Sequence, residues 1–343
     1  MSIIPDSVPT GAIRYNTDSN KMECFDGTKW WQVSVSSPDL GNSTNSDNHG
    51  GARGIYSGGS PTISNIDYFN MASQGDAVAF GSLGTARYLH GACASSTRAV
   101  FGGGNIPESN TMEYITIPST GSGTSFGNLV SNKRNLCGGG NKTRGVFVGG
   151  LEPGSSYQTD IDYITIASTG AAVDWGDLTV ARLDAETVCN GSRLVTYAGS
   201  VPSPTNGVNT MDYITIASTG NAQDFGDAKE LNNGHAGSGD SSTRGVFMGG
   251  RNQPSPNNIS TINYITIATL GNTNLFGDLT ASKRFVSGTS DKIRALCCGG
   301  YTSGNQDVIE YVNIATQGNG VDFGNLQTST YSAAAFSNGH GGL

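Results

Sequence analysis

Short stretches in which apolar and polar residues alternate recur along most of the chain. Residues 213–217, Tyr-Ile-Thr-Ile-Ala, are typical of them. A period of two residues predicts a β-strand with one face turned to a core, and Ile and Thr favour strands over helices. No segment combines a period of 3.6 residues with helix caps, so the pattern predicts an all-β protein with almost no helix.

Three sequence markers recur in a constant order, six times each, along residues 51–343. The first, an arginine followed by apolar residues and glycine, begins at Arg53, Arg98, Arg144, Arg193, Arg244 and Arg294. The second, an acidic or amide residue before a tyrosine, occupies residues 67–68, 113–114, 162–163, 212–213, 263–264 and 310–311. The third, an aromatic residue before glycine, occupies residues 80–81, 126–127, 175–176, 225–226, 276–277 and 323–324. The last two markers return every 46 to 51 residues, which indicates six similar structural units.

Each unit provides four predicted strands in about 50 residues, the period of a β-propeller. Strand b carries the arginine marker, strand c the tyrosine marker and strand d the aromatic–glycine pair. Strand a follows a basic residue, and its Gly, Ala, Ser and Cys side chains are small enough for the crowded centre of a propeller. An additional strand a at residues 331–337 has no strand b after it. We expect it to pair with the strand at Arg53 and to close a ring of six four-stranded blades over residues 51–343.

The order of these markers, with an aromatic residue 12 positions after the tyrosine, resembles the kelch repeat. Kelch units usually carry Trp in strand d, and here only Trp175 matches, so the resemblance is to a divergent kelch-like family. The nearly identical segments 163–170 and 213–220 also resemble repeats in structural proteins of marine bacteriophages. The kelch resemblance implies a six-bladed kelch-like β-propeller. The phage resemblance implies a place in a virion, but less directly, because one fold serves many functions.

Residues 1–40 predict a small β-hairpin or meander, followed by a polar linker at residues 41–50. Asp26-Gly27 is a strong hairpin-turn signal, and the predicted strands are residues 12–17, 21–25 and 29–35. A sheet of this size cannot bury both of its faces. Something must therefore cover the aromatic side chains of Tyr15, Phe25, Trp30 and Trp31. The propeller, a sister chain or a different protein could do so, and the polar linker favours docking to a separate assembly.

Residues 11–17 together with Trp30 resemble a module of phage tail-fibre and other virion proteins. The resemblance implies that the N-terminal segment attaches the chain to other virion proteins. It also implies a homotrimer, which nothing else in the sequence indicates.

Composition and charge narrow the classes of partner. The net charge of −8 and the pI near 4.9 argue against nucleic acid and anionic membranes, which need a basic surface. No apolar run is long enough to span a membrane, and the first residues lack the regions of a signal peptide. The six cysteines and four histidines have no metal-ligand spacing. We expect no metal and no cofactor, and small apolar roles for the cysteines.

Function is expected where the six units differ, which is in the loops between strands b and c. These loops are rich in proline and amide residues and share one face of a propeller with the d–a connections, so they suit recognition of a protein or glycan. The candidate recognition residues are Glu108, Asn110, Glu152, Tyr157, Asn206, Asn252, Asn257, Tyr301 and Asn305. Loops that bind nothing are the alternative. The arginines of strand b recur in every unit, so we expect them to bind the scaffold, either Asp residues of strand d or backbone carbonyls.

No catalytic motif is present: the chain has no Gly-x-Ser-x-Gly elbow and no phosphate-binding loop, and its carboxylates lie mainly at repeat-equivalent positions. The missing motifs predict a non-enzymatic protein, and the resemblance to phage repeats and to the tail-fibre module implies a bacteriophage virion protein, assembled in the host cytoplasm. The leading hypothesis is a tail-fibre or receptor-binding appendage whose hairpin docks to the particle and whose propeller face contacts a host glycan or protein, or neighbouring subunits. The alternatives are a head or tail decoration or connecting protein with virion partners only, and a lectin-like or adaptor propeller outside any virus.

Overall fold

The computed structural model describes residues 8–16, 21–32, 52–105, 108–203, 206–234, 237–252 and 257–343. Contacts divide the chain into two compact units, Met1–Asp47 and Asn48–Leu343. All regular structure among the described residues is β-strand, and every strand pair is antiparallel, so the predicted all-β class is confirmed.

The first unit contains one three-stranded sheet with the strand order β1-β2-β3. Its strands are β1 (Ile13–Asn16), β2 (Lys21–Phe25) and β3 (Trp30–Gln32). The predicted turn between β2 and β3 is present, and the Asp26 carboxylate accepts hydrogen bonds from the backbone N–H groups of Thr28 and Lys29. The turn between β1 and β2 and predicted residues 33–35 lie outside the described residues.

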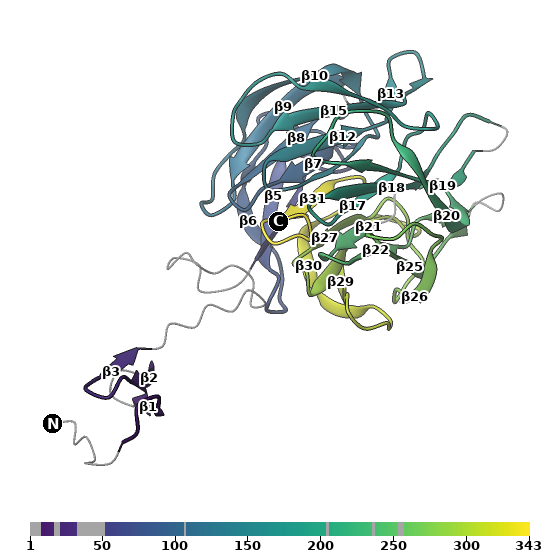
Figure 1. Ribbon diagram of the computed structural model, residues 1–343. Helices are drawn as coiled ribbons and strands as arrows, with labels where there is room; N and C mark the ends of the chain where they lie inside the picture. The colour runs from purple at the N-terminus through teal and green to yellow at the C-terminus, as the bar shows by residue number, and fades with distance from the viewer. Residues whose placement is uncertain are drawn as a thin grey trace. The chain divides into compact units, whose positions relative to one another are not determined.

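The second unit contains six sheets in which four strands lie side by side in the same order (Figure 1). The first strands are β7 (Gly91–Ala94), β11 (Cys137–Gly140), β17 (Glu186–Cys189), β21 (Gly237–Asp240), β27 (Ser287–Ser290) and β31 (Ala334–Ser337). The second strands are β8 (Arg98–Gly102), β12 (Arg144–Val148), β18 (Arg193–Gly199), β22 (Arg244–Met248), β28 (Arg294–Cys298) and β4 (Arg53–Ser57). The third strands are β9 (Ser109–Thr116), β15 (Asp160–Thr165), β19 (Val208–Thr215), β25 (Thr261–Thr266), β29 (Gln306–Asn313) and β5 (Asn65–Asn70). The fourth strands are β10 (Thr124–Lys133), β16 (Val173–Asp177), β20 (Gln223–Asn232), β26 (Asn274–Asp278), β30 (Val321–Thr330) and β6 (Val78–Ser82).

Two small hairpins extend the loops between second and third strands. They are formed by β13 (Leu151–Glu152) with β14 (Ser156–Tyr157), and by β23 (Arg251–Asn252) with β24 (Asn257–Asn258). The second hairpin also pairs with β20 through Asn232 and Asn252. The sheet that begins with β17 therefore has six strands.

The two ends of the second unit meet in one sheet. The C-terminal strand β31 pairs with β4 from Ala334 opposite Ser57 to Ser337 opposite Gly54, which is the pairing that the sequence predicted. Figure 1 shows the first strands towards the middle of the unit and the fourth strands towards its edge. Small side chains occupy the first strands because six of them converge there.

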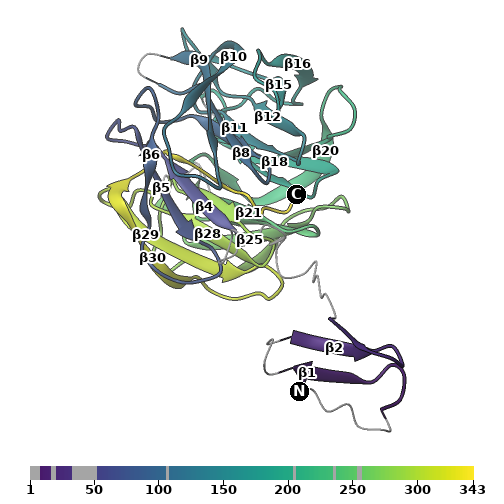
Figure 2. The same cartoon turned by 90° about the vertical axis from the view of Figure 1, so that its left-hand side faces the viewer.

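Six clusters of buried apolar side chains form the core, and each lies between two successive sheets. One includes Phe101 and Phe336, whose ring centroids are 5.1 Å apart and which connect the β7 sheet to the β31 sheet. Another includes Phe69 and Phe323, 5.8 Å apart, which connect the β31 sheet to the β27 sheet. Figure 2 shows β4 to β6 beside β28 to β30. Each of the six sheets therefore packs against two others.

The third marker needs glycine because a neighbouring sheet approaches it closely. Gly127 follows Phe126 on β10 with φ of 154°, and a Cβ at Gly127 would come within 2.0 Å of the carbonyl oxygen of Gly170. The N–H of Gly170 donates to the carbonyl oxygen of Phe126 at 2.8 Å. A side chain at position 127 would separate the two sheets at this point.

The first two markers also build contacts between elements. Each marker arginine lies over the tyrosine ring of its own unit, with guanidinium carbon to ring centroid distances from 4.2 to 5.4 Å. The same arginines donate to backbone carbonyls of the next sheet; Arg98, for example, reaches the oxygen of Ile166 at 3.0 Å. Of the two partners expected for these arginines, the carbonyl oxygens are the ones found.

Candidate functional site

The N-terminal sheet has two chemically different faces. Cys24 lies opposite both Ile13 and Trp31, and Tyr15 lies opposite Met22, so these five side chains share one face. Tyr15 is 58% exposed and Trp31 54% exposed, and Ile13 and Met22 are also exposed. The result is an apolar surface, here called the exposed face and defined by Ile13, Tyr15, Met22, Cys24 and Trp31.

The other face of the same sheet is covered by its own side chains. Phe25 is only 6% exposed, and its ring centroid is 5.2 Å from that of Trp30. The Arg14 guanidinium lies 4.2 Å from the Trp30 ring and forms an ion pair with Glu23 at 2.8 Å. The four predicted docking residues therefore divide: Tyr15 and Trp31 lie on the exposed face, whereas Phe25 and Trp30 pack on the other face of the sheet.

Trp31 is held in place by two charged neighbours. Its indole N–H donates to the Asp26 carboxylate, and the Lys29 ammonium lies 4.0 Å from its ring centroid. Hydrogen bonds from Trp31, Lys29 and Thr28 hold the pKa of Asp26 well below its usual range. A carboxylate that remains ionised keeps the indole in a fixed orientation, which lowers the entropy cost of binding a partner.

The loops between second and third strands form the second candidate surface, here called the loop face. Residues just before the first strands form isolated bridges to these loops; the bridged pairs are Tyr88 with Asn105, Arg134 with Leu151, Leu183 with Ser200, Arg284 with Tyr301, and Tyr331 with Ser60. The two sets of connections therefore lie together, as the sequence predicted.

Several of the predicted recognition residues already have partners within the chain. Glu108 forms an ion pair with Arg134 at 3.0 Å, and Asn305 donates to the carbonyl oxygen of Ser60 at 3.3 Å. Asn110 lies within β9, and Asn206 accepts a hydrogen bond on its backbone oxygen from Asn233.

The other predicted residues lie in the two small hairpins or beside them. Glu152 and Tyr157 pair with Ser156 and Leu151, respectively, and both are half-buried. Asn252 and Asn257 are backbone partners across the β23–β24 hairpin. Tyr301 is half-buried and forms an edge contact with Tyr331, with centroids 5.4 Å apart.

Sequence reasoning missed a group of side chains that the fold collects around Tyr301. They are Arg284, Phe285 and Tyr331, together with Arg251, which lies next to Arg284, and they come from three different connections. Phe285 has a positive φ of 53°, a conformation that it shares with Leu89, Asn135, Asp184 and Ser332 at the equivalent position of other units. This position lies two residues after the basic residue that precedes the first strand of a sheet, and its recurrence could be seen in the sequence. The sequence did not indicate which side chains would meet there.

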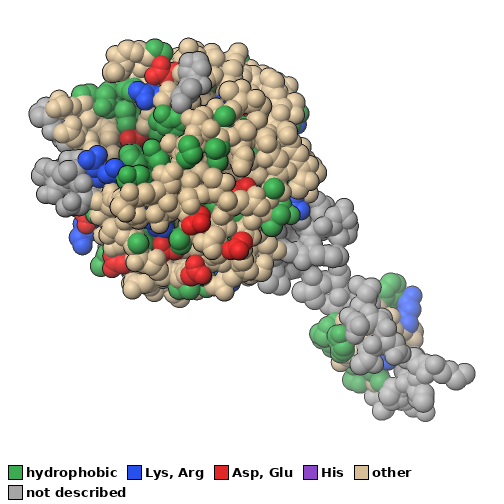
Figure 3. All heavy atoms as spheres, turned by 180° about the vertical axis from the view of Figure 1, so that it is seen from behind, with side chains coloured by type: hydrophobic (Ala, Val, Ile, Leu, Met, Phe, Trp, Pro, Cys, Tyr) green, Lys and Arg blue, Asp and Glu red, His purple; other side chains and the backbone are tan. Residues whose placement is uncertain are grey.

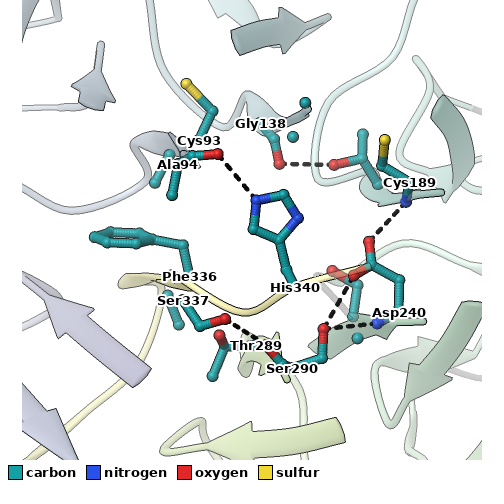
Figure 4. A pocket seen from close by; sticks show the side chains of 18 residues that line it. Cys93, Ala94, Gly138, Cys189, Asp240, Thr289, Ser290, Phe336, Ser337 and His340 are labelled. Atoms are coloured by element: carbon teal, nitrogen blue, oxygen red, sulfur yellow. Dashed lines mark hydrogen bonds between the residues drawn. The ribbon is translucent and has the colours of Figure 1, made fainter. Parts of the chain in front are cut away.

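The centre of the second unit contains a small cavity closed by the C-terminal segment (Figure 4). His340 donates from Nε2 to the carbonyl oxygen of Ala94 at 2.9 Å, and its Nδ1 accepts from the N–H of Gly342 at 3.1 Å. The Asp240 carboxylate accepts from the N–H groups of Cys189 at 2.6 Å and Gly341 at 2.7 Å, and from the Ser290 hydroxyl at 3.0 Å. These bonds hold the segment 338–343 across the first strands.

The size of this cavity decides what it can hold. Its volume is about 50 Å³, which admits water but is far below the roughly 300 Å³ or more of a typical ligand pocket. The five cysteines of the second unit are buried and free, and burial raises the thiol pKa of Cys93 and Cys297. The central cavity is therefore too small for a typical ligand, and the thiols of Cys93 and Cys189 that line it are unreactive.

Within the described ranges, no group of three His, Cys, Asp or Glu side chains could hold a metal ion. In the same ranges, no helix is long and apolar enough to cross a membrane. No protein-family model matches the chain, and no curated protein matches it. The geometry of the exposed face and of the loop face therefore carries the functional argument alone.

Proposed function

We propose that residues 51–343 form a six-bladed, kelch-like β-propeller in which each of the six sheets is one blade. Three observations support this architecture: the common strand order, the pairing of β31 with β4, and a core in which each sheet packs on two others. A ring of this kind leaves no end strand of the repeat available for pairing with another chain.

We further propose that the chain is a bacteriophage virion protein, a tail-fibre or receptor-binding appendage. The observation that carries this proposal is the exposed face of the N-terminal sheet. Four large apolar side chains on one face of a sheet with only 12 residues in its strands are costly to leave in water, and such patches mark protein interfaces. The occupant that we propose is another protein of the virion.

The second unit fits the other half of this role. On the face shown in Figure 3, backbone and uncharged side chains cover most of the second unit, with charged and apolar side chains between them. A stiff scaffold with varied loops presents a fixed recognition surface at little entropy cost. Contact with a host surface or with neighbouring subunits would take place on the loop face.

Particle incorporation tests the attachment. Chains that lack residues 1–47, or that carry both Tyr15→Ser and Met22→Ser, should fold but should fall at least about tenfold in copies per particle, since each change removes buried apolar area. Copies are counted by mass spectrometry of gradient-purified particles.

The matched control is Val78→Ser, which replaces an exposed apolar side chain of the second unit. It should leave incorporation unchanged. Equal incorporation of the double variant and the control would refute docking through the exposed face. A second measurement asks whether the isolated second unit changes the adsorption of particles to cells. If the wild-type chain is incorporated but its second unit has no effect on adsorption, the alternative, a decoration or connecting protein, is favoured.

A further inference from the structure

Two arginine side chains emerge next to each other on the loop face. Arg251 begins β23, and Arg284 lies in the connection that precedes β27. Gly234 lies between them: a Cβ at this glycine would be 2.9 Å from the Cβ of Arg251 and 3.6 Å from the Cβ of Arg284. The missing side chain at position 234 is what lets the two arginines approach each other.

Among the described residues, no acidic side chain compensates the positive charge of this pair. No carboxylate of the described residues forms an ion pair with either guanidinium, and the Nε atoms of both are buried without a hydrogen-bond partner there. The Arg251 guanidinium donates no hydrogen bond to the described chain, and Arg284 makes one weak bond, to Oδ1 of Asn258 at 3.4 Å. Burial, together with the charge of Arg284, lowers the pKa of Arg251.

A third arginine on the loop face shows how this charge could have been neutralised. Arg134 occupies the position in its unit that Arg284 occupies in its own, directly after the buried basic residue. Arg134 forms an ion pair with Glu108 at 3.0 Å. The Arg251–Arg284 pair has no such acid, although the chain as a whole carries a net charge of −8.

Aromatic rings lie beside Arg284. The Arg284 guanidinium carbon is 5.1 Å from the ring centroid of Phe285 and 5.2 Å from that of Tyr301. Tyr331 lies 5.9 Å from Phe285 and 5.4 Å from Tyr301. All five side chains are half-buried, so they form a partly desolvated surface with two cations at its edge.

We propose that Arg251, Arg284, Phe285, Tyr301 and Tyr331 bind a carboxylated sugar residue of an acidic cell-surface polysaccharide. The guanidinium donors would bind the sugar carboxylate, because planar arginine groups bind carboxylates through paired, charge-assisted hydrogen bonds. The aromatic rings would pack against the apolar face of the sugar, and the tyrosine hydroxyls would accept or donate hydrogen bonds at its edge. This inference rests on the proposed receptor-binding function and names its ligand class.

A single-stranded nucleic acid also combines anions with flat rings. Its binding needs a basic groove that follows several phosphates, together with stacked aromatic residues. Here two arginines stand together on an acidic protein, which matches a ligand with one anion per recognised unit. A sugar acid is therefore the ligand that these residues favour.

Calorimetric titration of the full chain tests the site. The probes are short oligomers of galacturonic acid, glucuronic acid and N-acetylneuraminic acid, each beside its methyl ester, which removes the charge and keeps the sugar. At least one acid should bind about tenfold or more tightly than its ester at low salt and should weaken in 0.5 M NaCl.

Variants locate the site. Arg251→Gln and Arg284→Gln should each lower the affinity about tenfold, and Tyr301→Ala should lower it for acid and ester alike. Arg134→Gln, which changes the neutralised arginine, should have less than a twofold effect. Unchanged thermal unfolding would show that the variants are folded.

Four results would overturn the proposal: no binding by any of the three acids at millimolar concentration, equal binding of acid and ester, wild-type affinity of Arg251→Gln, or displacement of the saccharide by oligodeoxythymidylate. The purified chain is used throughout, so a negative result does not depend on particle incorporation. Likewise, failed incorporation would leave saccharide binding untouched.

Discussion

The guanidinium of Arg294 donates a hydrogen bond to the backbone oxygen of Met71 at 3.0 Å, across 223 positions of the sequence. It is the last in a series of six, in which each marker arginine reaches the end of the third strand in the following sheet. The carbonyl partners of Arg53, Arg98, Arg144, Arg193, Arg244 and Arg294 are Ile117, Ile166, Ile216, Ile267, Ile314 and Met71. The sixth bond connects the β27 sheet to the β31 sheet, which also contains β4, β5 and β6, the strands with which the second unit begins in the sequence.

This contact predicts the effect of removing the arginine. Arg294→Met should lower the free energy of unfolding by about 2 kcal/mol, since it removes a charge-assisted hydrogen bond and a cation–π contact with Tyr311. The midpoint of guanidinium denaturation measures the change. Arg251→Met, which removes no hydrogen bond to the described chain and relieves repulsion with Arg284, is the control and should not lower the midpoint. Equal midpoints for both variants would contradict a stabilising role of the series.

Four buried acids on third strands form ion pairs with basic residues, whereas the buried Asp67 on the equivalent strand β5 forms no ion pair with the described residues. Arg87 with Glu113, Lys133 with Asp162, Arg182 with Asp212, and Lys283 with Glu310 are the four pairs. In the β21 sheet, Asn232 takes the place of the basic residue and Asn263 the place of the acid. In the β31 sheet, Thr330 takes the place of the basic residue, and the acid is Asp67. Asp67 is 5% exposed and accepts a hydrogen bond from the N–H of Gln327 at 3.3 Å.

Asp67→Asn should therefore stabilise the protein at pH 7, by on the order of 1 kcal/mol. Burial raises the pKa of the Asp67 carboxyl, so the folded protein holds this proton more tightly than the unfolded chain. The wild type then loses stability as pH rises from the unfolded pKa through the folded pKa, and the variant does not. Unfolding followed between pH 4 and pH 8 measures both curves.

The matched change at a paired acid has the opposite sign. Asp162→Asn leaves the buried ammonium of Lys133 with one carboxylate, that of the partly exposed Asp160 at 3.3 Å, and should destabilise the fold by about 2 kcal/mol at pH 7. If Asp67→Asn proved as harmful as Asp162→Asn, Asp67 would have a stabilising partner that the hydrogen bonds described above do not include.

The C-terminal segment predicts a change in thiol reactivity. Deleting residues 338–343 removes the bonds of His340 to Ala94 and of Gly341 to Asp240, and opens the central cavity next to Cys189. Cys189 should then react with a thiol reagent such as dithionitrobenzoate at least about tenfold faster than in the wild type, where burial raises its pKa. A Cys189→Ser version of the deletion identifies the reacting thiol. An unchanged rate would show that the segment does not close the cavity.

The sequence predicted the repeating scaffold well because each marker serves one contact that recurs in every unit. Gly127 must be small for the turn at Gly170, and Tyr114 must be flat for Arg98, so these residue types persist and can be counted. The pairing of Ala334–Ser337 with β4 followed from the same count. The aromatic residues of the N-terminal segment were also identified, but the register that separates Trp30 from Trp31 was needed to show which of them are exposed.

The arginine–aromatic cluster could not be predicted in this way. Arg251, Arg284 and Tyr331 come from connections that differ between units, so no repeat marks them, and they meet only because the chain returns to the same face of the unit. The absence of a side chain at Gly234 became meaningful only once its neighbours were known.

We propose that the N-terminal sheet fixes a six-bladed propeller to a virion. Electron cryo-microscopy of purified particles, from cells that make the wild-type chain or the Tyr15→Ser and Met22→Ser double variant, tests it most directly. We expect a six-bladed disc on a tail or fibre of wild-type particles, with Tyr15 and Trp31 against another virion protein, and no disc on particles made with the double variant. A particle without this density, or a disc of five or seven blades, would contradict the account.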